Sequence, residues 1–394
     1  MSTVKVRSVG GRRDLDAFIG LPFRLHRGTP WVPPLIAERR DFLNRDKNPF
    51  FDQGEAEYFV AERGGEVVGR ISAQTDERWT KHNGGNDGMF GFFDCEQRPE
   101  TASALVEAAA AWLRERGRER MLGPMDFTTN DECGLLVEGF ELAPFVLEPW
   151  HPSYYQGLIE GLGMSKAMDL LMWRLELGQL KQGNRFHDLI HQAADVSATE
   201  HGVVIRHMRK RDLEAEVKRF MEVYNEAWDR NWGFVPVTEE EVRFQVKNLK
   251  PILDENWAMI AERGGEVVGA ALTLPDINQV LRKMNGRLLP FGWLRFLAGR
   301  RKVDRVRVFA LGVKPSCQHL GVAAALYVEH IEMAARVRQK WGEMGWILET
   351  NEPMNRAMEG MGGTVVKRYR LYELPLTGPP VTASIPQTAE RTVG

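Results

Sequence analysis

The most informative segment of this sequence is VFALGVKPSCQHLGVAAALY, residues Val308–Tyr327. An apolar strand is expected to end at Val313, a turn with Pro315 follows, and a helix opens directly after QHLGVA. Glycine at position 321 lets the backbone approach a ligand closely. The free N–H groups of a first helical turn, at the positive end of the helix dipole, hold phosphate groups well. The segment therefore predicts a pyrophosphate-binding turn between a strand and a helix.

A nine-residue repeat indicates that the chain contains two copies of one unit. The sequence AERGGEVVG occurs at Ala61–Gly69 and again at Ala261–Gly269, which is typical of internal duplication. In both places apolar residues flank a Gly-Gly turn, so each copy predicts a β-hairpin. Each copy also ends on a similar strand, MWRLEL at Met172–Leu177 and YRLYEL at Tyr369–Leu374.

The other elements follow the same order in both copies. The strand after the hairpin is Met89–Cys95 in the first copy and Arg305–Val313 in the second. An Ala-rich amphipathic helix comes next, over Thr101–Arg116 or Val322–Lys340. We therefore expect an α/β (α+β) fold with two tandem domains, each a mixed, mostly antiparallel sheet flanked by helices.

The repeat also sets the expected domain boundaries. The first domain spans residues 1–177 and the second spans 202–374. Residues 178–201 between them are a polar stretch that forms either a linker or one extra helix. The tail, residues 375–394, is rich in proline and poor in apolar residues, so we expect it to be disordered.

The sequence resembles the GNAT superfamily of acyl-CoA N-acyltransferases. QHLGVA fits the family signature (Gln/Arg)-x-x-Gly-x-(Gly/Ala) in spacing and in its place between strand and helix, and the resemblance covers nearly the whole chain. It implies that acetyl-CoA or a longer acyl-CoA is the acyl donor, whose pantetheine arm contacts Leu311, Gly312, Val313 and Asn351. By the same resemblance, the pyrophosphate lies on Gln318, His319, Leu320, Gly321, Val322 and Ala323.

The first copy lacks this turn. After Cys95 it continues EQRPETASALVEAA, where Pro99 and Thr101 indicate an ordinary helix start. We therefore expect the first copy to be a scaffold or one wall of the acceptor site. The aromatic cluster Trp150–Tyr155 suits a cleft between domains, or else packs an interdomain core.

The usual catalytic residues of the family are absent. Many members carry a carboxylate base on the fourth strand and a tyrosine acid on the fourth helix, and those places hold Arg307 and Met358 here. Asp276 and Glu349, each at a strand end, are the substitute base candidates, and the alternative for both is a turn cap or a solvated carboxylate. Tyr327 and Tyr369 are the acid candidates.

Two segments bear on the acceptor, which is a small-molecule or lipid amine. Residues 278–303 mix Leu, Phe and Trp with Arg and Lys, which indicates a peripheral membrane contact, a lid over a greasy substrate, or a flap packed on the protein. Three aromatics lie within Ala227–Glu241, where this superfamily shapes its acceptor pocket. Both features favour a long-chain acyl group or a long-tailed amine, as in tandem enzymes that resemble ceramide synthases.

Composition excludes several other classes. A length of 394 residues fits two or three domains, and a formal net charge of −2 argues against nucleic acid as a partner. No apolar run reaches the ~20 residues of a membrane span, and the first residues lack the apolar core of a secretory signal. Three cysteines without ligand spacing predict no metal site, no disulfide framework and a cytoplasmic location.

Two alternative functions stay open at this level. Since both usual catalytic side chains are missing, the chain could be an inactive acyl-CoA sensor or scaffold. A tRNA-dependent aminoacyl transferase uses similar tandem folds, but the net charge of −2 counts against binding RNA.

Overall fold

In the computed structural model, which describes residues 3–176 and 185–377, both copies form the hairpin that the Gly-Gly turn predicts. β2 (Gly54–Arg63) pairs with β3 (Glu66–Asp76), and β9 (Ala258–Arg263) pairs with β10 (Glu266–Pro275). The two glycines of each turn have φ values of 61° and 85° or 59° and 86°. Glycine reaches this left-handed backbone without steric cost, so the repeated turn closes both hairpins.

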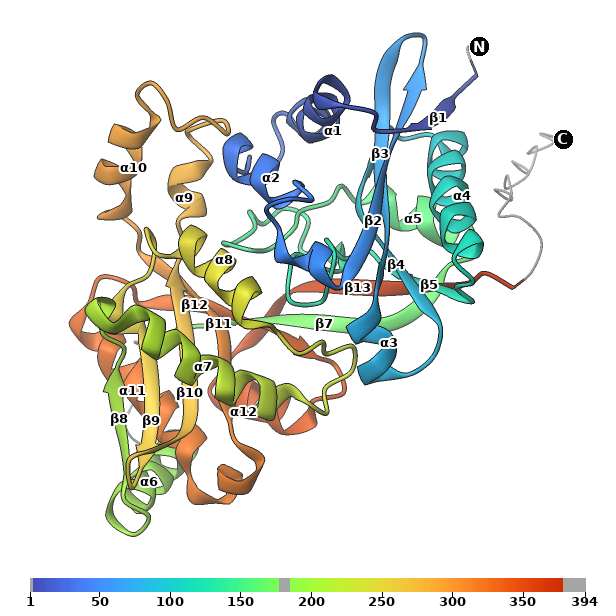
Figure 1. Cartoon of the computed structure of the whole chain (residues 1–394). Coiled ribbons are helices and arrows are strands. Elements are labelled where there is room, and N and C mark those ends of the chain that lie inside the picture. Colours follow the sequence, from blue (N-terminus) through green and yellow to red (C-terminus); the bar gives the residue numbers. More distant parts are fainter. Residues whose placement is uncertain (1–2, 177–184, 378–394) are drawn as a thin grey trace, which may run out of the picture.

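One continuous sheet contains the strands of both copies (Figure 1). Its order is β1-β2-β3-β4-β5-β13-β7-β12-β11-β10-β9-β8, and β6 pairs with β13. The pairs β4–β5 and β11–β12 are parallel and the others are antiparallel, which confirms a mixed, mostly antiparallel sheet. The remaining strands are β1 (Lys5–Ser8), β4 (Asp87–Cys95), β5 (Arg120–Gly123), β6 (Leu135–Glu138), β7 (Ser165–Leu175), β8 (Val203–His207), β11 (Arg305–Val313), β12 (Trp341–Leu348) and β13 (Thr364–Pro375).

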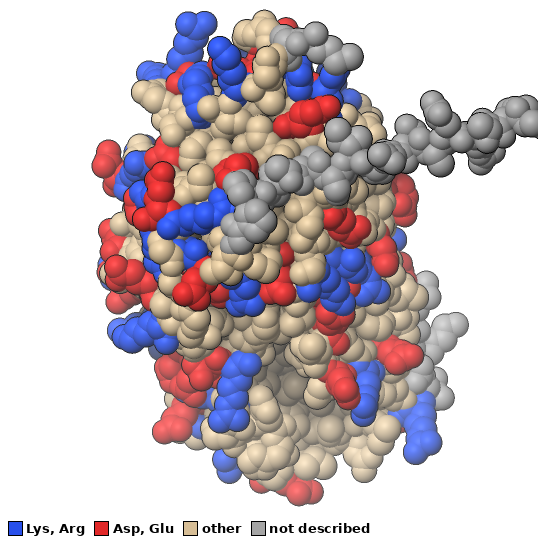
Figure 2. All heavy atoms as spheres, turned by 90° about the vertical axis from the view of Figure 1, so that its right-hand side faces the viewer, with Lys and Arg blue, Asp and Glu red and all other residues tan. Residues whose placement is uncertain are grey.

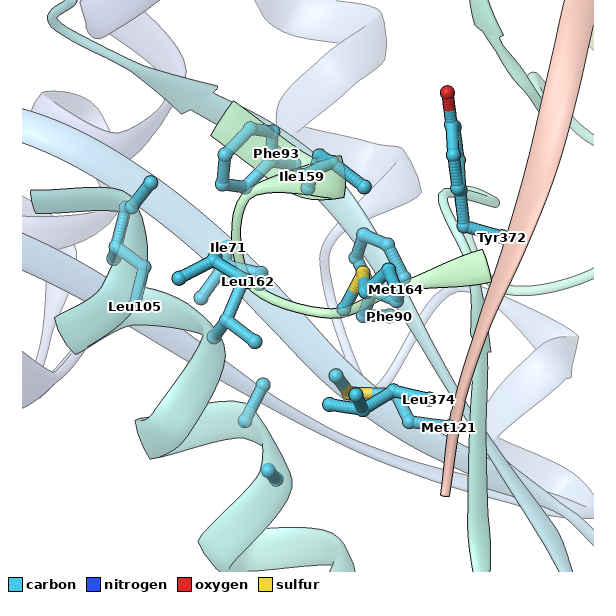
Figure 3. Packing of buried hydrophobic residues seen from close by; sticks show 14 of the residues in the cluster. Ile71, Phe90, Phe93, Leu105, Met121, Ile159, Leu162, Met164, Tyr372 and Leu374 are labelled. Atoms are coloured by element: carbon cyan, nitrogen blue, oxygen red, sulfur yellow. The ribbon is translucent and has the colours of Figure 1, made fainter. Parts of the chain in front are cut away.

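The last strands of the two copies are exchanged. β7 of the first copy pairs with β12 of the second, and β13 of the second copy pairs with β5 of the first. Figure 3 shows Tyr372 and Leu374 of β13 beside Phe90 and Met121 in the core of the first copy. The expected segments 1–177 and 202–374 therefore do not form two separate sheets, because each completes the sheet of the other.

Helices cover both faces of the sheet because the buried side chains alternate along each strand. In β9, Met259 and Ala261 pack in the cluster with α11 (Val322–Arg336), whereas Ala258 and Ile260 pack in the cluster with α7 (Leu213–Trp228). The other α-helices are α1 (Arg12–Leu25), α2 (Ile36–Phe42), α3 (Glu77–Asn83), α4 (Pro99–Glu115), α5 (Tyr154–Glu160), α6 (Arg185–Thr199), α8 (Glu239–Leu249), α9 (Asn278–Leu281), α10 (Gly292–Arg300) and α12 (Glu352–Gly360).

Three segments differ from the sequence-based expectation. The stretch 178–201, expected as a linker or an extra helix, contains α6, which packs against α11; its residues 178–184 lie outside the described part. The helix expected through Lys340 ends at Arg336, because Val337 is extended. The tail was expected to begin at 375, but β13 continues through Pro375 and Leu376 is buried in the first copy; residues 378–394 lie outside the described part.

The face of the molecule near the C-terminal end of β13 carries charges of both signs. Figure 2 shows basic and acidic side chains interleaved over the face near the C-terminal end of β13. Within residues 3–176 and 185–377, no helix has the length and apolar character that crossing a bilayer requires.

Candidate active site

A cleft opens where β11 and β12 separate. The two strands pair in parallel from Arg305 opposite Trp341 to Val308 opposite Met344, and no further. Beyond that point they enclose a cavity of about 780 Å³ together with α7, α11 and α12. The β10–β11 ladder also skips Phe309, since Thr273 faces Val308 and its neighbour Leu272 faces Ala310. A bulge of this kind leaves main-chain groups without ladder partners beside the cavity.

The predicted pyrophosphate turn lies at one end of this cleft. Residues Pro315–Leu320 form a 3₁₀ turn, and α11 begins at Val322. Gly321 has φ 73° and ψ 11°, a left-handed conformation that suits glycine. Its α-carbon faces α6, because a β-carbon at 321 would lie 2.6 Å from the main-chain oxygen of Ala193.

The structure brings six of the ten predicted cofactor residues to the cleft wall. They are Leu311, Gly312, Val313, Gln318, Ala323 and Asn351. Of the other four, His319 is exposed, Leu320 and Val322 are buried, and Gly321 faces α6. Asn351 also caps α12, since its side chain accepts a hydrogen bond from the Met354 N–H.

Of the two tyrosines considered as acids, one lies in the cleft. Tyr327 lines the cavity and its hydroxyl donates to the Met354 sulfur at 3.1 Å. Burial raises the pKa of Tyr327 to about 12, so the phenol keeps its proton at neutral pH and can donate it. Tyr369 is fully buried between the halves, away from the cleft wall. Met358, at the family's tyrosine position, lines the cleft without offering a proton.

Asp276 is buried outside the cleft wall. Its Oδ2 accepts a hydrogen bond from Arg305 Nε at 2.7 Å, and its Oδ1 accepts the Val146 N–H at 3.0 Å. Burial raises its pKa to about 6 against the attraction of Arg305. These contacts tie the second copy to the loop after β6. Both carboxylate oxygens of Asp276 are occupied by them, so the structure does not favour Asp276 as the base.

Glu349 is likewise held by structural partners. Lys166 Nζ donates to its Oε2 at 2.7 Å, and the Asp169 N–H donates to its Oε1 at 3.1 Å. Leu348 and Thr350 on either side line the cleft, but Glu349 points to the exchanged strand β7. Its role as a base therefore stays a prediction without geometric support.

A buried charge cluster joins the two halves beneath the cleft. Lys367 donates hydrogen bonds to Glu148 and Glu343, and all three side chains are almost fully excluded from solvent. Burial opposes ionisation of Glu148, but Lys367 and Arg307 outweigh it and lower its pKa. Burial and the charge of Glu148 raise the pKa of Glu343. Arg307, at the family's base position, thus serves as a buried counter-ion.

A second cavity lies between the halves, and we refer to it as the chamber. It encloses about 450 Å³ and has walls from both copies: Trp150, His151 and Pro33–Leu35 of the first, and α8, α9 and α10 of the second. Trp150 and His151 thus line a space between the halves, whereas Tyr155 packs in the first copy's core. Burial lowers the pKa of His151 to about 4, so its imidazole is neutral at pH 7.

A smaller cavity of about 100 Å³ lies between the chamber and the cleft. It shares Cys133 with the chamber, and it shares Phe309 and Trp346 with the cleft. The indole N–H of Trp346 is buried and has no hydrogen-bond partner among the residues that the structure describes. Trp228, Asn231 and Trp232, from the aromatic segment Ala227–Glu241, line both this cavity and the cleft.

Sequence reasoning missed the polar residues of the chamber. Arg39, Asp126 and Glu132 line one end of it. A signal existed, because the polar loop 126–132 follows the strand after the long helix of the first copy, the place where the second copy carries Asn351. In the described ranges, no three His, Cys, Asp or Glu side chains are grouped to hold a metal ion.

Comparisons with known proteins give two similar relatives, although no family model matches the chain. It is 38% identical over 370 residues to a protein named bacterial ceramide synthase from Caulobacter vibrioides, covering 91% of this chain and 94% of that protein. It is 37% identical over 376 residues to Protein YghO of Escherichia coli, covering 93% and 94%.

Solved structures share the fold at low sequence identity. A tandem GNAT protein from the clavulanic acid biosynthesis pathway matches with a TM-score of 0.55 and 12% identity, over 95% of this chain and 99% of that one. A GCN5-related N-acetyltransferase from Sphaerobacter thermophilus matches with a TM-score of 0.52 and 13% identity, over 97% and 98%. With two relatives above 30% identity over nearly its whole length and a GNAT fold throughout, the chain belongs to the GNAT superfamily of acyl-CoA N-acyltransferases, in a tandem two-copy form.

Proposed function

We propose that this N-acyltransferase moves a long-chain acyl group from CoA to the amine of a lipid. The observation that carries the proposal is the β11–β12 cleft, whose 780 Å³ cavity meets the pyrophosphate turn at one end and Phe309 and Trp346 at the other. The similarity to a protein named bacterial ceramide synthase supports a lipid amine as the acceptor class.

The proposed reaction needs no covalent enzyme intermediate. The pantetheine arm of the acyl-CoA lies along Leu311–Val313, with its pyrophosphate near Gln318 and Ala323. The amine nitrogen attacks the thioester carbonyl, a C–N bond forms and the C–S bond breaks. The nitrogen loses one proton, and the leaving CoA thiolate takes up one proton. Main-chain N–H groups at the Phe309 bulge stabilise the oxyanion, and positioning supplies much of the rate.

Apolar space beside the reacting end supports a long acyl chain rather than acetyl. A pocket of about 80 Å³ between α7 and α8 shares Phe309 and Tyr224 with the smaller cavity and has almost entirely apolar walls. Acetyl-CoA would leave this space unused. A preference for palmitoyl-CoA over acetyl-CoA in turnover supports the proposal, and equal use of the two contradicts it.

Ala323→Asp should weaken palmitoyl-CoA binding by at least about tenfold, because its carboxylate would face the pyrophosphate across a short distance. Ala335→Asp is the matched control, since Ala335 is exposed on the last turn of the same helix. Calorimetric titration of both variants measures the difference. Equal affinity in the two variants would contradict the placement of the donor, and binding without turnover in the wild type would favour the sensor alternative.

We also propose that residues 278–303, called the flap from here, touch a membrane surface. The flap carries Leu289 and Phe291 with exposed fractions of 74% and 69%. Its seven basic side chains are all exposed, and the flap contains no acidic residue: Arg282, Lys283, Arg287, Arg295, Arg300, Arg301 and Lys302. Each basic residue near an anionic bilayer contributes about 1 kcal/mol. A cytoplasmic location is part of this proposal, and three free cysteines support it.

The wild type should co-sediment with vesicles that contain phosphatidylglycerol, and added salt should weaken this binding. The double variant Leu289→Asp/Phe291→Asp should lose about tenfold or more in affinity, because two apolar side chains no longer leave water. Val204→Asp is the control, since Val204 is also exposed but lies on β8. If the double variant sediments like the control, the flap is not the contact.

A further inference from the structure

One end of the chamber holds more negative than positive charge. Three carboxylates surround the single guanidinium of Arg39: Glu132 at 2.7 Å, Asp126 at 3.5 Å and Glu38 at 3.7 Å. The other charged groups in the chamber wall have partners of their own, since Asp94 pairs with Arg70 and Glu148 pairs with Lys367. We call the group of Arg39, Glu38, Asp126 and Glu132 the acidic end. It has three carboxyl groups and one guanidinium, so it can accept a further cation.

The opposite walls of the chamber are hydrocarbon. Leu249 ends α8 and Ile252 follows it. Ile277 and Leu281 lie at α9, and Phe296 lies on α10. Leu288, Trp293 and Leu297 of the flap line the same space while remaining partly exposed. A ligand that fills the chamber thus meets carboxylates at one end and apolar side chains along the rest.

A separate observation also points to a ligand in this space. Glu148 lines the chamber and is fully buried, and among the described residues its Oε1 has only the Arg307 Nε at 3.7 Å, which is beyond hydrogen-bond distance. Arg307 balances the charge of this oxygen without donating a hydrogen bond to it. Buried carboxylate oxygens normally accept hydrogen bonds, so this oxygen is free to accept one from a ligand in the chamber. The chamber also shares Cys133 with the smaller cavity, which adjoins the acyl-CoA cleft.

We propose that the chamber is the acceptor site, where Asp126 and Glu132 bind the ammonium of a long-chain amine and the apolar walls hold its tail. The inference rests on the proposed function, since it supplies the acceptor for acyl transfer. Asp126 then takes one proton from the ammonium, which leaves a neutral amine with a free electron pair for attack on the thioester. In this arrangement the first copy binds the acceptor and the second binds the donor.

The surroundings of Asp126 suit a proton acceptor near neutral pH. Burial and the charge of Glu132 raise the pKa of Asp126 to about 7, against the attraction of Arg39. Its Oδ1 also accepts the Phe92 N–H at 2.9 Å. The titratable and charged groups that face it from the packed elements are Arg39, Tyr58, Arg70, Asp131, Glu132 and Cys133. A general base works best when its pKa lies near the operating pH.

Titration of the full-length protein with decylamine and decanol tests the acceptor site without acyl-CoA. The amine should bind at least about tenfold more tightly than the alcohol, because only the amine supplies a charge to the acidic end. Asp126→Asn and Glu132→Gln should each weaken decylamine binding about 10- to 100-fold and leave decanol and palmitoyl-CoA affinities unchanged. Equal binding of amine and alcohol, or full decylamine affinity in both variants, would overturn the proposal.

Asp131→Asn is the matched control. Asp131 lies in the same loop and outside the chamber wall, and burial raises its pKa well above the usual range, so asparagine mimics its protonated form. It should bind decylamine like the wild type. Because palmitoyl-CoA binding is measured separately, loss of donor binding would count against the proposed function, whereas loss of amine selectivity alone would count against the acceptor site.

The pH dependence of turnover distinguishes proton transfer by Asp126 from a purely structural role of this residue. In the wild type, kcat/KM for decylamine should rise with pH through about 7, as the carboxyl of Asp126 in the free enzyme loses its proton. Asp126→Asn should abolish this rise. Affinity should also increase about threefold to fourfold per methylene from hexylamine to decylamine. If affinity did not change with chain length, the amine tail would not lie against the apolar walls.

Discussion

Replacing Lys367 by methionine should lower the free energy of unfolding by about 3–5 kcal/mol, the usual cost of breaking a buried ion pair. Lys367 is the shared partner of Glu148 and Glu343, and the three side chains are almost completely buried. Without the ammonium, two carboxylates face each other in the interior. Glu148 keeps Arg307 at 3.7 Å and Glu343 keeps Arg174 at 2.8 Å, so the protein should fold but melt earlier.

Chemical denaturation at several pH values measures this loss. Without Lys367, the two facing carboxylates should have a raised pKa in the folded variant. The folded state then binds more protons than the unfolded state, so the loss of unfolding free energy should become smaller as the pH falls toward about 5. Lys47→Met is the matched control, because Lys47 pairs with Asp41 on the surface and should cost no more than about 1 kcal/mol. Similar losses in both variants would mean that the cluster contributes no more than a surface pair.

Local patterns explain why much of the fold could be predicted. The hairpins depend on two adjacent glycines with positive φ, and the turn before α11 depends on Gly321, so each is encoded within a few residues. The same holds for the six cleft residues, which lie on β11, in the turn, at the start of α11 or at the start of α12. Features of this kind depend on neighbours in the sequence, which a single sequence contains.

The strand exchange could not be predicted in this way. The closing strands β7 and β13 both combine mostly apolar residues with an arginine, Arg174 in one and Arg370 in the other, so composition does not assign either strand to one sheet. Burial patterns give the faces of a strand but not its neighbour. The choice depends on the whole sheet, including the β7–β13 pairing at its centre.

The catalytic candidates illustrate the same difficulty. The positions of Asp276 and Glu349 at strand ends predict two candidate bases. Their hydrogen-bond partners Val146 and Lys166 come from the other copy. Likewise, Arg39 reaches Asp126 and Glu132 from α2, far away in the sequence. A single sequence shows which carboxylates exist, and only the packing of the two copies shows which of them have spare negative charge.

The contact between α6 and the pyrophosphate turn leads to a second large expected effect. The small residues Ala193 and Ser197 allow α6 to approach Gly321 closely, and Ser197 is fully buried. Since Gln318 and Ala323 on either side of Gly321 line the cleft, any shift of this turn moves the donor site. The glycine thus has two roles, a left-handed backbone and room for a neighbouring helix.

Gly321→Ala and Gly362→Ala separate these two roles. Both glycines have left-handed backbones, φ 73° and 78°, but a β-carbon at 362 meets nothing within 4 Å. Gly362→Ala should cost about 1–2 kcal/mol from backbone strain alone. Gly321→Ala should cost that plus about 1–3 kcal/mol, because α6 must move, and it should also weaken palmitoyl-CoA binding. Denaturation and calorimetry measure both effects. If the two variants lost the same stability and palmitoyl-CoA binding were unchanged, α6 would move aside at no cost and would not hold the turn in place.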